Sequence, residues 1–519
     1  MKARDLPRYY NVVDILERNL RERGAKIALY SAERQMTFQE VSAEVNQVGN
    51  ALKQLGVGFG DVVGIMAPDS AAWVTSFFGT VKIGAVALGI DTASQPPQCE
   101  YVLRDSRARV LIVDAGLLLV VDAVRDRCPC LRQVIVIGGS GRADALDFDD
   151  WMRDGATNLE AEQTHRDDYC SLSYSSGSTG EPKGVLHAHR TYTLVGELIG
   201  VGLYGQRESD RIFSIPKLSF AFGLTSNLIY PWYVGASCVL YSGQPQAVTD
   251  VLATIDRFKP TVLYGVPTSY VGLLAVRGLN SRYDLSSLRL CVSGGEVLPV
   301  SVWHAWKAKT GLELMDVNGS TENCSIFLAS RPGEVRPGST GRPAPGYRAK
   351  LVDEAGAEVG TGEIGNLLIS GESAALFYLH HPEKSRQTFR GEWLFTGDQY
   401  YVDNDGYYWY AGRADDMLKV GGLWVAPAEI EGVITAHPAV QECAVVGYPD
   451  GSKLIKPKAI VCLNEGFTAS PELAADLRTW CMERLAVHKC PRWIDFVAAL
   501  PKTSTGKIQR FRLRDNANK

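Results

Sequence analysis

The sequence predicts an α/β protein in which a large N-terminal domain precedes a smaller C-terminal one. The 519 residues exceed the length, roughly 250 to 300, at which a single hydrophobic core tends to divide. In the first part of the chain, short β-branched runs alternate with helical segments, which favours a parallel or mostly parallel sheet covered by helices. Near residue 400 the pattern changes to aromatic, hairpin-like segments, so a domain boundary is expected there.

A helix is predicted over residues 37–56. Thr37 and Glu40 have the spacing of a capping box, and Gly56 stands where a helix C-terminus favours glycine. The apolar residues between them recur every three or four positions, as one face of a helix requires: Val41, Val45, Val48, Leu52 and Leu55.

The alternation of strands and helices continues beyond this helix. Strands are expected at residues 62–67, 85–90, 109–114, 133–139, 261–267 and 288–296. Helices are expected over residues 71–83 and directly after Pro299, since proline is favoured in the first turn of a helix.

The aromatic stretch YYVDNDGYYWYAGR (residues 400–413) is typical of a β-hairpin. Asp405 and Gly406 form the dipeptide that a type I′ turn favours. The charged, glycine-rich segment that follows and the remaining hundred or so residues suit a small α+β unit. We therefore predict an N-terminal domain over residues 1–414 and a C-terminal domain over residues 415–519, with the boundary at Asp415.

The composition is that of an ordinary globular protein, with 45% hydrophobic and 22% charged residues. A net charge of −4 provides no overall field for a polyanion, so nucleic acid is not expected as a partner. The 11 cysteines lack the spacing of a zinc site or a disulfide framework and are expected to be reduced. No signal peptide or membrane-spanning run is visible, so we expect a cytoplasmic protein that does not enter membranes.

Residues 171–190, SLSYSSGSTGEPKGVLHAHR, contain a loop rich in glycine, serine and threonine behind an apolar–polar alternation. Such a loop can turn its N–H groups inward, and its hydroxyl groups and a lysine add donors for phosphate oxygens. No window fits the G-x-x-x-x-G-K-[ST] pattern, so the loop is not a P-loop. The sequence predicts a phosphate site, with an ordinary surface loop as the alternative.

This loop and five later motifs resemble the adenylate-forming superfamily of acyl- and aryl-CoA synthetases, adenylation domains and luciferases. The later motifs are, in order, SGGE (293–296), NGSTE (318–322), TGD (396–398), GRADDMLKVGG (412–422) and PKTSTGKIQR (501–510). The resemblance implies a large domain of helix-covered mixed sheets and a small, mobile α+β C-terminal domain. It also implies an AMP-forming acid–thiol ligase that uses ATP, Mg²⁺ and coenzyme A.

The resemblance assigns the nucleotide site by position. Glu322 matches the Mg²⁺ ligand, since this hard cation prefers carboxylate oxygen, and Thr321 would contact the α-phosphate. Asp398, assisted by Arg413, would accept hydrogen bonds from the ribose hydroxyls. The remaining assignments are Ser175, Ser176, Gly177, Ser178, Thr179, Gly180 and Lys183 for the β- and γ-phosphates, Gly294, Gly295 and Glu296 for adenine, and the adjacent Asn318, Gly319 and Ser320.

The resemblance places the first chemical step on Lys507. An ammonium fixed between the attacking carboxylate and the α-phosphate lowers the barrier electrostatically. The family carries this lysine on a C-terminal domain that rotates about a hinge residue, which Asp415 matches. After rotation, the segment containing Lys419, Gly421 and Gly422 would face the pantetheine arm of coenzyme A.

Within the superfamily, the branch that this sequence resembles most is the benzoate-type aryl-CoA ligases. The resemblance lies in PKLSFAFGLTSNLIYPWYVGA (216–236) and NGSTENCSIFLASRPGEVRPGSTGRPAPGY (318–347). Where those ligases tend to have tyrosine and a Leu-His pair, this chain has Phe222 and the smaller pair Cys324-Ser325, so a substituted benzoate such as an amino- or hydroxybenzoate is expected. The residues expected to line the acid's slot are Phe220, Ala221, Phe222, Gly223, Tyr264, Gly265 and Cys324.

Three alternatives stay open at this point. The enzyme could load an aryl group onto the phosphopantetheine of a carrier protein, or act on a non-aromatic acid as an acyl-CoA synthetase. A nucleotide-binding protein without catalysis is disfavoured, because simple binding does not require both Glu322 and Lys507. A homodimer is expected only from the frequency of two-fold assemblies.

Overall fold

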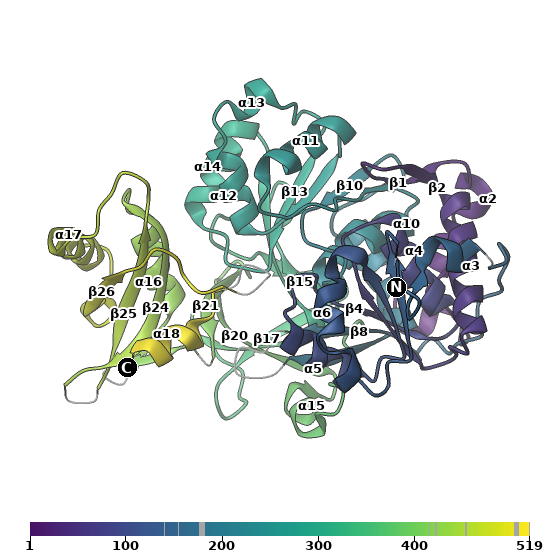
Figure 1. Ribbon diagram of the computed structural model, residues 1–519. Helices are drawn as coiled ribbons and strands as arrows, with labels where there is room; N and C mark the ends of the chain where they lie inside the picture. The colour runs from purple at the N-terminus through teal and green to yellow at the C-terminus, as the bar shows by residue number, and fades with distance from the viewer. Residues whose placement is uncertain are drawn as a thin grey trace.

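The computed structural model describes the chain except for residues 140, 154, 176–181, 415, 421–422, 452–453, 503–507 and 518–519. A large N-terminal part, built on extended sheets, is followed by a small C-terminal unit that stands to one side of it (Figure 1). The predicted fold class, a large α/β domain with a small α+β domain, is confirmed. Asp415 lies outside the described residues, and the boundary at that residue stays a prediction.

The first sheet is mainly parallel, and its last pair, β8 and β9, is antiparallel. The predicted strands at 62–67, 85–90, 109–114 and 133–139 are all confirmed. The strand order is β7 (Leu146–Asp147), β6 (Gln133–Ile137), β5 (Val110–Asp114), β3 (Val62–Met66), β4 (Val86–Gly89), β8 (Tyr169–Ser175) and β9 (Lys183–Ala188).

The second sheet is parallel from β14 to β1 and has antiparallel strands at both edges. Its order is β16 (Arg342–Pro343), β15 (Ser325–Ala329), β14 (Leu314–Ser320), β13 (Leu290–Gly294), β12 (Val262–Gly265), β10 (Arg211–Ser214), β11 (Ser237–Val239), β1 (Ile27–Tyr30) and β2 (Gln35–Thr37). The predicted strands at 261–267 and 288–296 are β12 and β13. Their carboxyl ends therefore meet at one edge of the sheet, together with the end of β14.

Helices cover and separate these sheets. They are α1 (Asp14–Glu17), α2 (Leu20–Arg23), α3 (Phe38–Gln54), α4 (Ala71–Lys82), α5 (Pro96–Ser106), α6 (Leu118–Asp122), α7 (Phe148–Arg153), α8 (His189–Val195), α9 (Ala221–Leu224), α10 (Tyr230–Tyr233), α11 (Val248–Phe258), α12 (Pro267–Ala275), α13 (Leu279–Arg282), α14 (Val300–Thr310) and α15 (Pro382–Thr388). The predicted capping box of α3 is present, because the Thr37 side chain accepts from the Glu40 N–H and the Glu40 carboxylate accepts from the Thr37 N–H. The helix predicted after Pro299 is α14.

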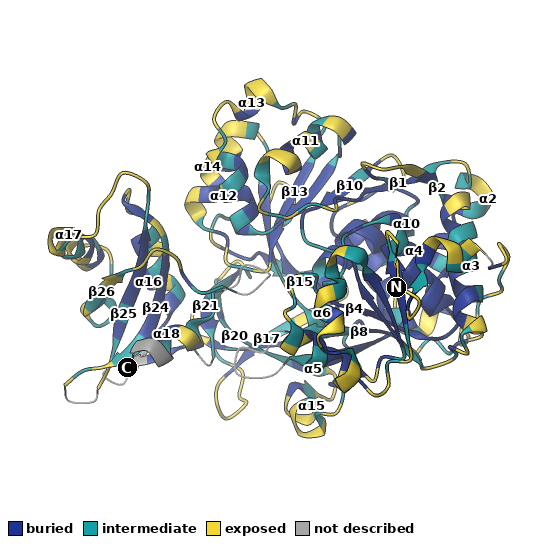
Figure 2. Ribbon diagram, viewed as in Figure 1, coloured by how far each residue is buried: buried dark blue, intermediate teal, exposed yellow. Residues whose placement is uncertain are grey.

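The core runs through both sheets and the helix between them. Nearly every residue of α4 is buried, and Phe78 stacks on Trp232 with ring centroids 5.3 Å apart. Figure 2 shows the same pattern: the central strands and α4 are buried, and exposure is concentrated on loops and outer helices. This rigid packing fixes the ends of the strands that carry the candidate site.

The aromatic hairpin is present, but its predicted type I′ turn is wrong. It joins β20 (Trp393–Val402) to β21 (Tyr408–Arg413) in an antiparallel sheet with β17 (Arg348–Val352), β18 (Gly365–Ser370) and β19 (Phe389–Arg390). The loop spans residues 403–407, and Gly406, but not Asp405, has a positive φ. The Asp403 carboxylate accepts from the N–H groups of Asp405 and Tyr407, which stabilises this longer loop instead.

The C-terminal unit has its own core around a three-stranded sheet. Its elements are β22 (Leu418–Val420), β23 (Leu423–Val425), α16 (Pro427–Thr435), β24 (Val440–Pro449), β25 (Ile455–Leu463), α17 (Pro471–Met482), β26 (Trp493–Phe496) and α18 (Arg510–Ala517). On one face Val445 packs with residues of α16 and α17. On the other face Val446 packs with Leu513 of α18, so the alternation along β24 buries both faces.

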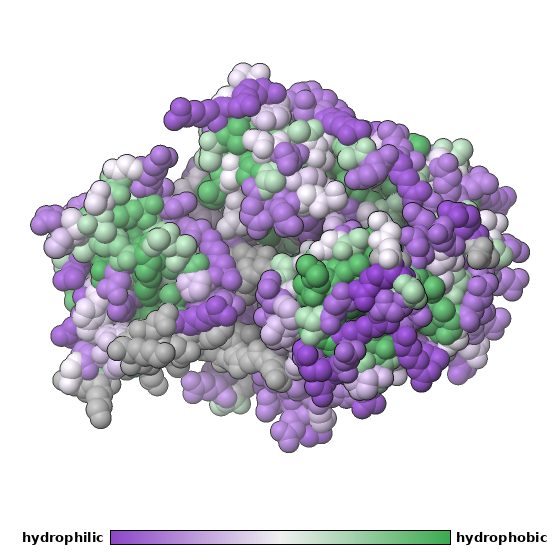
Figure 3. All heavy atoms as spheres, in the orientation of Figure 1, coloured by the Kyte–Doolittle hydropathy of each residue, from purple (hydrophilic) through white to green (hydrophobic). Residues whose placement is uncertain are grey.

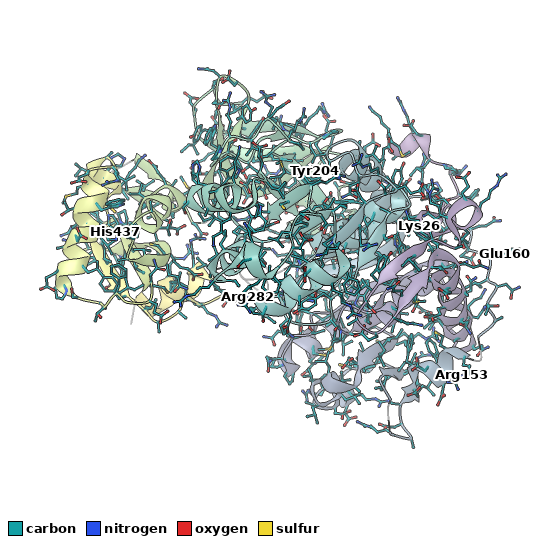
Figure 4. All side chains as sticks on the ribbon, turned by 90° about the horizontal axis from the view of Figure 1, so that it is seen from above. Lys26, Arg153, Glu160, Tyr204, Arg282 and His437 are labelled. Carbon is teal, nitrogen blue, oxygen red and sulfur yellow. The ribbon has the colours of Figure 1, made fainter. Side chains whose placement is uncertain are left out.

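The face of the molecule seen in Figure 3 suits the composition of an ordinary globular protein. Hydrophilic residues cover most of the face seen in Figure 3, with hydrophobic residues gathered on parts of the C-terminal unit and around α6. In the view from above, His437 of the C-terminal unit lies at the opposite end of the molecule from Lys26 and Glu160 (Figure 4).

Across the described chain, every helix is too short or too polar to span a bilayer. All 11 cysteines are free, as predicted.

Candidate active site

The predicted phosphate loop connects two antiparallel strands of the first sheet. Ser175 ends β8 and pairs with Lys183, which begins β9. The Tyr174 hydroxyl donates to the Asp105 carboxylate over 2.7 Å and anchors the base of this hairpin to α5. The other residues predicted to bind phosphate lie outside the described residues, so their roles remain predictions: Ser176, Gly177, Ser178, Thr179 and Gly180.

Glu322 lies in a short 3₁₀ turn, η6 (Thr321–Asn323), which follows β14. Its carboxylate accepts a hydrogen bond of 2.7 Å from the Tyr378 hydroxyl. The Lys183 ammonium lies 5.6 Å from the centroid of the Tyr378 ring. The structure thus brings together Lys183 of the phosphate loop and Glu322 of a distant motif through Tyr378.

Tyr378 is a residue that the sequence reasoning missed. It is 4% exposed, and burial together with the Glu322 charge raises its pKa, so the hydroxyl stays a donor. The two residues are 56 positions apart, and no spacing pattern in the sequence connects them. Only the folded chain shows that this tyrosine orients the carboxylate.

Glu322, which is predicted to bind Mg²⁺, belongs to no larger cluster of metal-binding side chains among the described residues. In the part of the chain that the structure describes, no three His, Cys, Asp or Glu side chains cluster as a metal site. A lone carboxylate fits Mg²⁺, which keeps several waters and binds proteins through one or two carboxylates plus substrate phosphates. Glu322 would then hold a cation that arrives with ATP.

Of the two glycines expected beside adenine, Gly294 ends β13 and Gly295 follows it. A Cβ on Gly294 would lie 2.7 Å from Val317 Cγ2 and 3.2 Å from the Phe222 ring, and Gly295 has a φ of +88°. Gly319 is equally crowded, because a Cβ there would lie 2.5 Å from the Ser325 carbonyl oxygen. Close approach of the chain to itself therefore requires glycine here, in addition to the predicted approach of a base. Glu296 follows directly in the same loop, and Ser320 caps η6 by accepting from Asn323 N–H.

The predicted ribose side forms a connected polar group. Asp398 is buried and pairs with Arg413 over 2.9 Å. The Asn318 amide donates to Asp398 at 3.3 Å and to the Tyr400 hydroxyl at 2.8 Å. Asn318, expected in the nucleotide site, thus joins Asp398, which is expected to bind the ribose, to Tyr400.

Asp316, also on β14, is a second residue missed from the sequence. Burial raises the pKa of its carboxyl group well above the usual value, and it lies close enough to influence Tyr400 electrostatically. A carboxyl group in such surroundings favours its protonated form. It adds a buried polar group at the sheet edge near the residues predicted to bind the nucleotide.

The acyl side is built by close packing. Phe220 precedes α9 and, like Phe222, is half-buried, whereas Ala221 is buried. A Cβ on Gly223 would lie only 2.0 Å from the Lys217 carbonyl oxygen. This turn leaves the two phenylalanine residues partly exposed, and their contact with a ring-shaped acid stays a prediction.

Tyr264 supports this slot from behind. The Phe222 ring meets it edge-on at 87°, with centroids 6.0 Å apart, while Tyr264 itself is fully buried. Its hydroxyl accepts from the Gln206 amide, and the Tyr204 ring, labelled in Figure 4, lies 6.5 Å away. A Cβ on Gly265 would lie 2.9 Å from the Tyr270 ring, so this position requires glycine.

Cys324 ends the 3₁₀ turn after Glu322 with a φ of +57°, a left-handed conformation that is uncommon for a side chain. It is buried beside Tyr192, and burial raises the pKa of its thiol to about 12. The next residue, Ser325, shares a 2.7 Å hydrogen bond with the Tyr230 hydroxyl. Both small residues therefore lie directly behind the Glu322 turn.

Most of the functional residues predicted in the C-terminal part lie outside the described residues: Lys507, Asp415, Gly421 and Gly422. The Lys419 backbone belongs to β22 and pairs with Trp424 of β23. Next to the expected hinge, Asp416 pairs with Arg514 of α18 over 3.0 Å. Arg510, at the start of that helix, pairs with Glu431 over 2.8 Å, so ion pairs hold α18 to the segment after the hinge.

The chain matches the AMP-binding enzyme family over residues 16–379 and the AMP-binding enzyme C-terminal domain over residues 429–507. The chain is an AMP-binding enzyme. This AMP-binding enzyme is 43% identical over 513 residues to a benzoate–CoA ligase of Thauera aromatica, covering 98% of the chain and 96% of that protein.

Two solved structures resemble this AMP-binding enzyme over nearly their whole length. One is the anthranilate CoA ligase AuaEII in complex with anthranoyl-AMP, with 57% identity, a TM-score of 0.96, and 100% and 99% of the two chains covered. The other is a benzoate CoA ligase from Burkholderia xenovorans LB400, with 39% identity, a TM-score of 0.91, and 97% and 100% covered. The predicted superfamily and its benzoate-type branch are confirmed, and the matches support aryl-CoA ligase activity, the class of an acid–thiol ligase.

Proposed function

We propose that this enzyme converts an aromatic carboxylic acid, ATP and coenzyme A into aryl-CoA, AMP and pyrophosphate, with 2-aminobenzoate (anthranilate) as its acid. The observation that carries the choice of acid is the 57% identity, over the whole chain, with an anthranilate CoA ligase solved with anthranoyl-AMP. The benzoate ligases compared above are 43% and 39% identical. We therefore rank anthranilate before unsubstituted benzoate.

The acyl side supports a flat substrate. Phe220 and Phe222 are half-buried and present ring surface, and an aromatic edge or face is their favoured partner. Cys324 and Ser325 are small, which leaves volume for a substituent on the ring. An aliphatic chain would gain less from this wall, because it lacks the quadrupole that orients aromatic pairs.

The chemistry needs two steps in one site. First, a carboxylate oxygen of the acid attacks the α-phosphorus of ATP, the bond to the bridging oxygen breaks, and pyrophosphate leaves. Lys507 would stabilise the charge that gathers between the two anions, with Thr321 at the α-phosphate and Glu322 holding Mg²⁺. Second, the thiol sulfur attacks the acyl carbon, its proton passes to solvent, and AMP leaves with the electrons of the acyl–oxygen bond.

The two steps need different surroundings, which supports rotation of the C-terminal unit at Asp415. Pyrophosphate has to leave before the thiol approaches the same carbonyl carbon. The rotation would exchange Lys507 for the segment that contains Lys419, Gly421 and Gly422. Free coenzyme A is the acceptor that we propose, and a carrier-protein phosphopantetheine presents the same thiol.

A panel of acids tests the proposal. Purified protein with ATP and Mg²⁺ is given anthranilate, benzoate, 4-hydroxybenzoate or octanoate, and pyrophosphate release is measured before coenzyme A is added. We expect the highest kcat/KM for anthranilate and an aryl-CoA product on addition of coenzyme A. A preference for benzoate would replace anthranilate as the proposed substrate. Activity confined to octanoate would overturn the proposal of an aromatic acid.

A further inference from the structure

The strand that leaves the phosphate loop makes contacts with the Glu322 turn that the assigned roles do not use. Lys183, Val185 and His187 alternate along β9 and so share one face. Lys183 lies over the Tyr378 ring, Val185 forms a bridge with Tyr378, and the His187 imidazole reaches the Thr321 carbonyl oxygen. One face of β9 is therefore fitted to the segments that carry Glu322 and its partner.

The His187 contact is short, buried and directional. Its Nε2 lies 2.7 Å from the Thr321 carbonyl oxygen, and the side chain is 0% exposed. Since a carbonyl only accepts, Nε2 carries the proton and donates it. Burial lowers the pKa of His187 to about 4, so the ring is neutral at ordinary pH and acts as a single donor.

All three carbonyl groups of the turn Thr321–Asn323 are bonded to segments outside it. His187 binds the Thr321 oxygen, the Ala375 N–H binds the Glu322 oxygen at 2.7 Å, and the Ser373 hydroxyl binds the Asn323 oxygen at 2.9 Å. The Thr321 carbonyl belongs to the peptide plane between Thr321 and Glu322. Its orientation sets the directions in which both side chains leave the backbone.

We propose that His187 is a positioning residue for the adenylation step. Its Nε2–H holds the Thr321–Glu322 peptide in register with β9, and so keeps the Mg²⁺ carboxylate at a set distance from the phosphate loop. The inference rests on the proposed roles of Thr321 and Glu322. The Thr321 oxygen also accepts from the Cys324 N–H at 3.0 Å, but the hydrogen-bond geometry of a short 3₁₀ turn is poor, so the His187 donor adds a second bond from outside the turn.

His187→Leu removes the donor at similar volume, and His187→Gln keeps an N–H donor of comparable reach. Aryl-AMP formation is measured as a function of Mg²⁺ concentration, and thioester formation is measured from synthetic aryl-AMP. For His187→Leu we expect adenylation to fall by about tenfold or more and the Mg²⁺ concentration at half-maximal rate to rise, since small misplacements are costly. Thioester formation should suffer less, and His187→Gln should restore most of the adenylation rate.

The chain offers a matched control two residues away. His189 is also 0% exposed, but its Nδ1 accepts from the Val12 N–H at 3.1 Å and makes no hydrogen bond to the turn among the described residues. His189→Leu should lower the melting temperature and leave the Mg²⁺ dependence unchanged. If His187→Leu does not fold, His187→Asn, which is too short to reach the carbonyl, replaces it.

An unchanged Mg²⁺ dependence in His187→Leu or His187→Asn would overturn the proposal, as would equal losses in His187→Leu and His187→Gln. Failure of the wild-type protein to form aryl-AMP from any acid would instead overturn the proposed function, so the two failures are distinguishable.

Discussion

The nucleotide side and the acyl side of the candidate site are held by different forces. On the nucleotide side, hydrogen bonds join distant segments, as Tyr378 joins Glu322 and as Asn318 joins Asp398. On the acyl side, close packing dominates, as where Gly223 fits against the Lys217 carbonyl oxygen and Phe222 against Tyr264. Charged phosphates and Mg²⁺ require directional partners, whereas an aromatic ring requires shape. Substitutions on the two sides should therefore change different kinetic constants.

The largest effect is expected from Lys507→Ala, because we propose that the C-terminal unit brings this cation between the acid and the α-phosphate. Adenylation should fall by about a hundredfold or more, as for removal of other transition-state donors. Thioester formation from synthetic aryl-AMP should be less affected. Assays of the two half-reactions check this, and equal losses in both would remove Lys507 from its role.

Asp398→Ala should weaken the binding of ATP without affecting the acyl side. The substitution removes the buried carboxylate that pairs with Arg413 and accepts from Asn318. A hydrogen bond to a charged group contributes about 1.5 to 3 kcal/mol, so its loss should raise the KM for ATP by about tenfold or more. The KM for the aryl acid should change much less. Asp403→Ala, in the hairpin of the same sheet, is the control, since Asp403 pairs with Arg336 instead.

Gly294→Ala acts on the acyl side through its contact with Phe222, although Gly294 itself is expected beside adenine. The new Cβ would lie 2.7 Å from Val317 Cγ2 and 3.2 Å from the Phe222 ring, so the side chains of Val317 and Phe222 have to shift. The KM for the aryl acid should rise severalfold more than the KM for ATP. Gly58→Ala is the matched control, because no atom lies within 4 Å of the added carbon. Equal changes in both constants would show that the two sides are not separable here.

Tyr378→Phe tests the nucleotide side with a smaller chemical change. It removes one hydrogen bond to Glu322, worth about 1 kcal/mol, and leaves the ring beside Lys183. The Mg²⁺ concentration at half-maximal adenylation should rise about fivefold, with an unchanged KM for the acid. Titration of the adenylation rate with Mg²⁺ measures it, and an unchanged Mg²⁺ requirement would mean that the hydroxyl does not orient Glu322.

The smallest effects are expected in stability, and the two sides should respond to pH with opposite signs. His187, on the nucleotide side, has a pKa lowered by burial to about 4, so its contribution is complete above about pH 6.5 and declines as the pH falls toward 4. Asp69 accepts from the Leu218 N–H, two residues before Phe220 on the acyl side, and burial raises its pKa to about 6. Its contribution to stability is complete below about pH 3.8 and is lost as the pH rises through 6.

Melting temperatures across pH 4 to 7 check these signs. Relative to wild type, His187→Gln should gain stability as the pH falls, and Asp69→Asn should gain stability as the pH rises. Parallel melting curves for all three proteins would contradict both assignments.

The elements with strong local signals were predicted well, and the turn chemistry less so. The capping box of α3 and the β-branched strands of both sheets depend on contacts within a few residues, which a sequence displays directly. The Asp405-Gly406 turn was predicted wrongly because Asp403 binds two backbone N–H groups further along the loop. That competition between local hydrogen bonds is invisible in a dipeptide pattern.

The sequence alone determined the motifs that act as continuous segments, the order of the elements and the family to which they belong. Only the tertiary structure decided which side chains meet across those segments. Tyr378 on Glu322, His187 on the Thr321 carbonyl oxygen and Tyr264 behind Phe222 each join residues far apart in the chain. The physical reason is that a motif needs only its own backbone, whereas a positioned carboxylate or a slot wall needs partners that parallel strands and buried helices bring together.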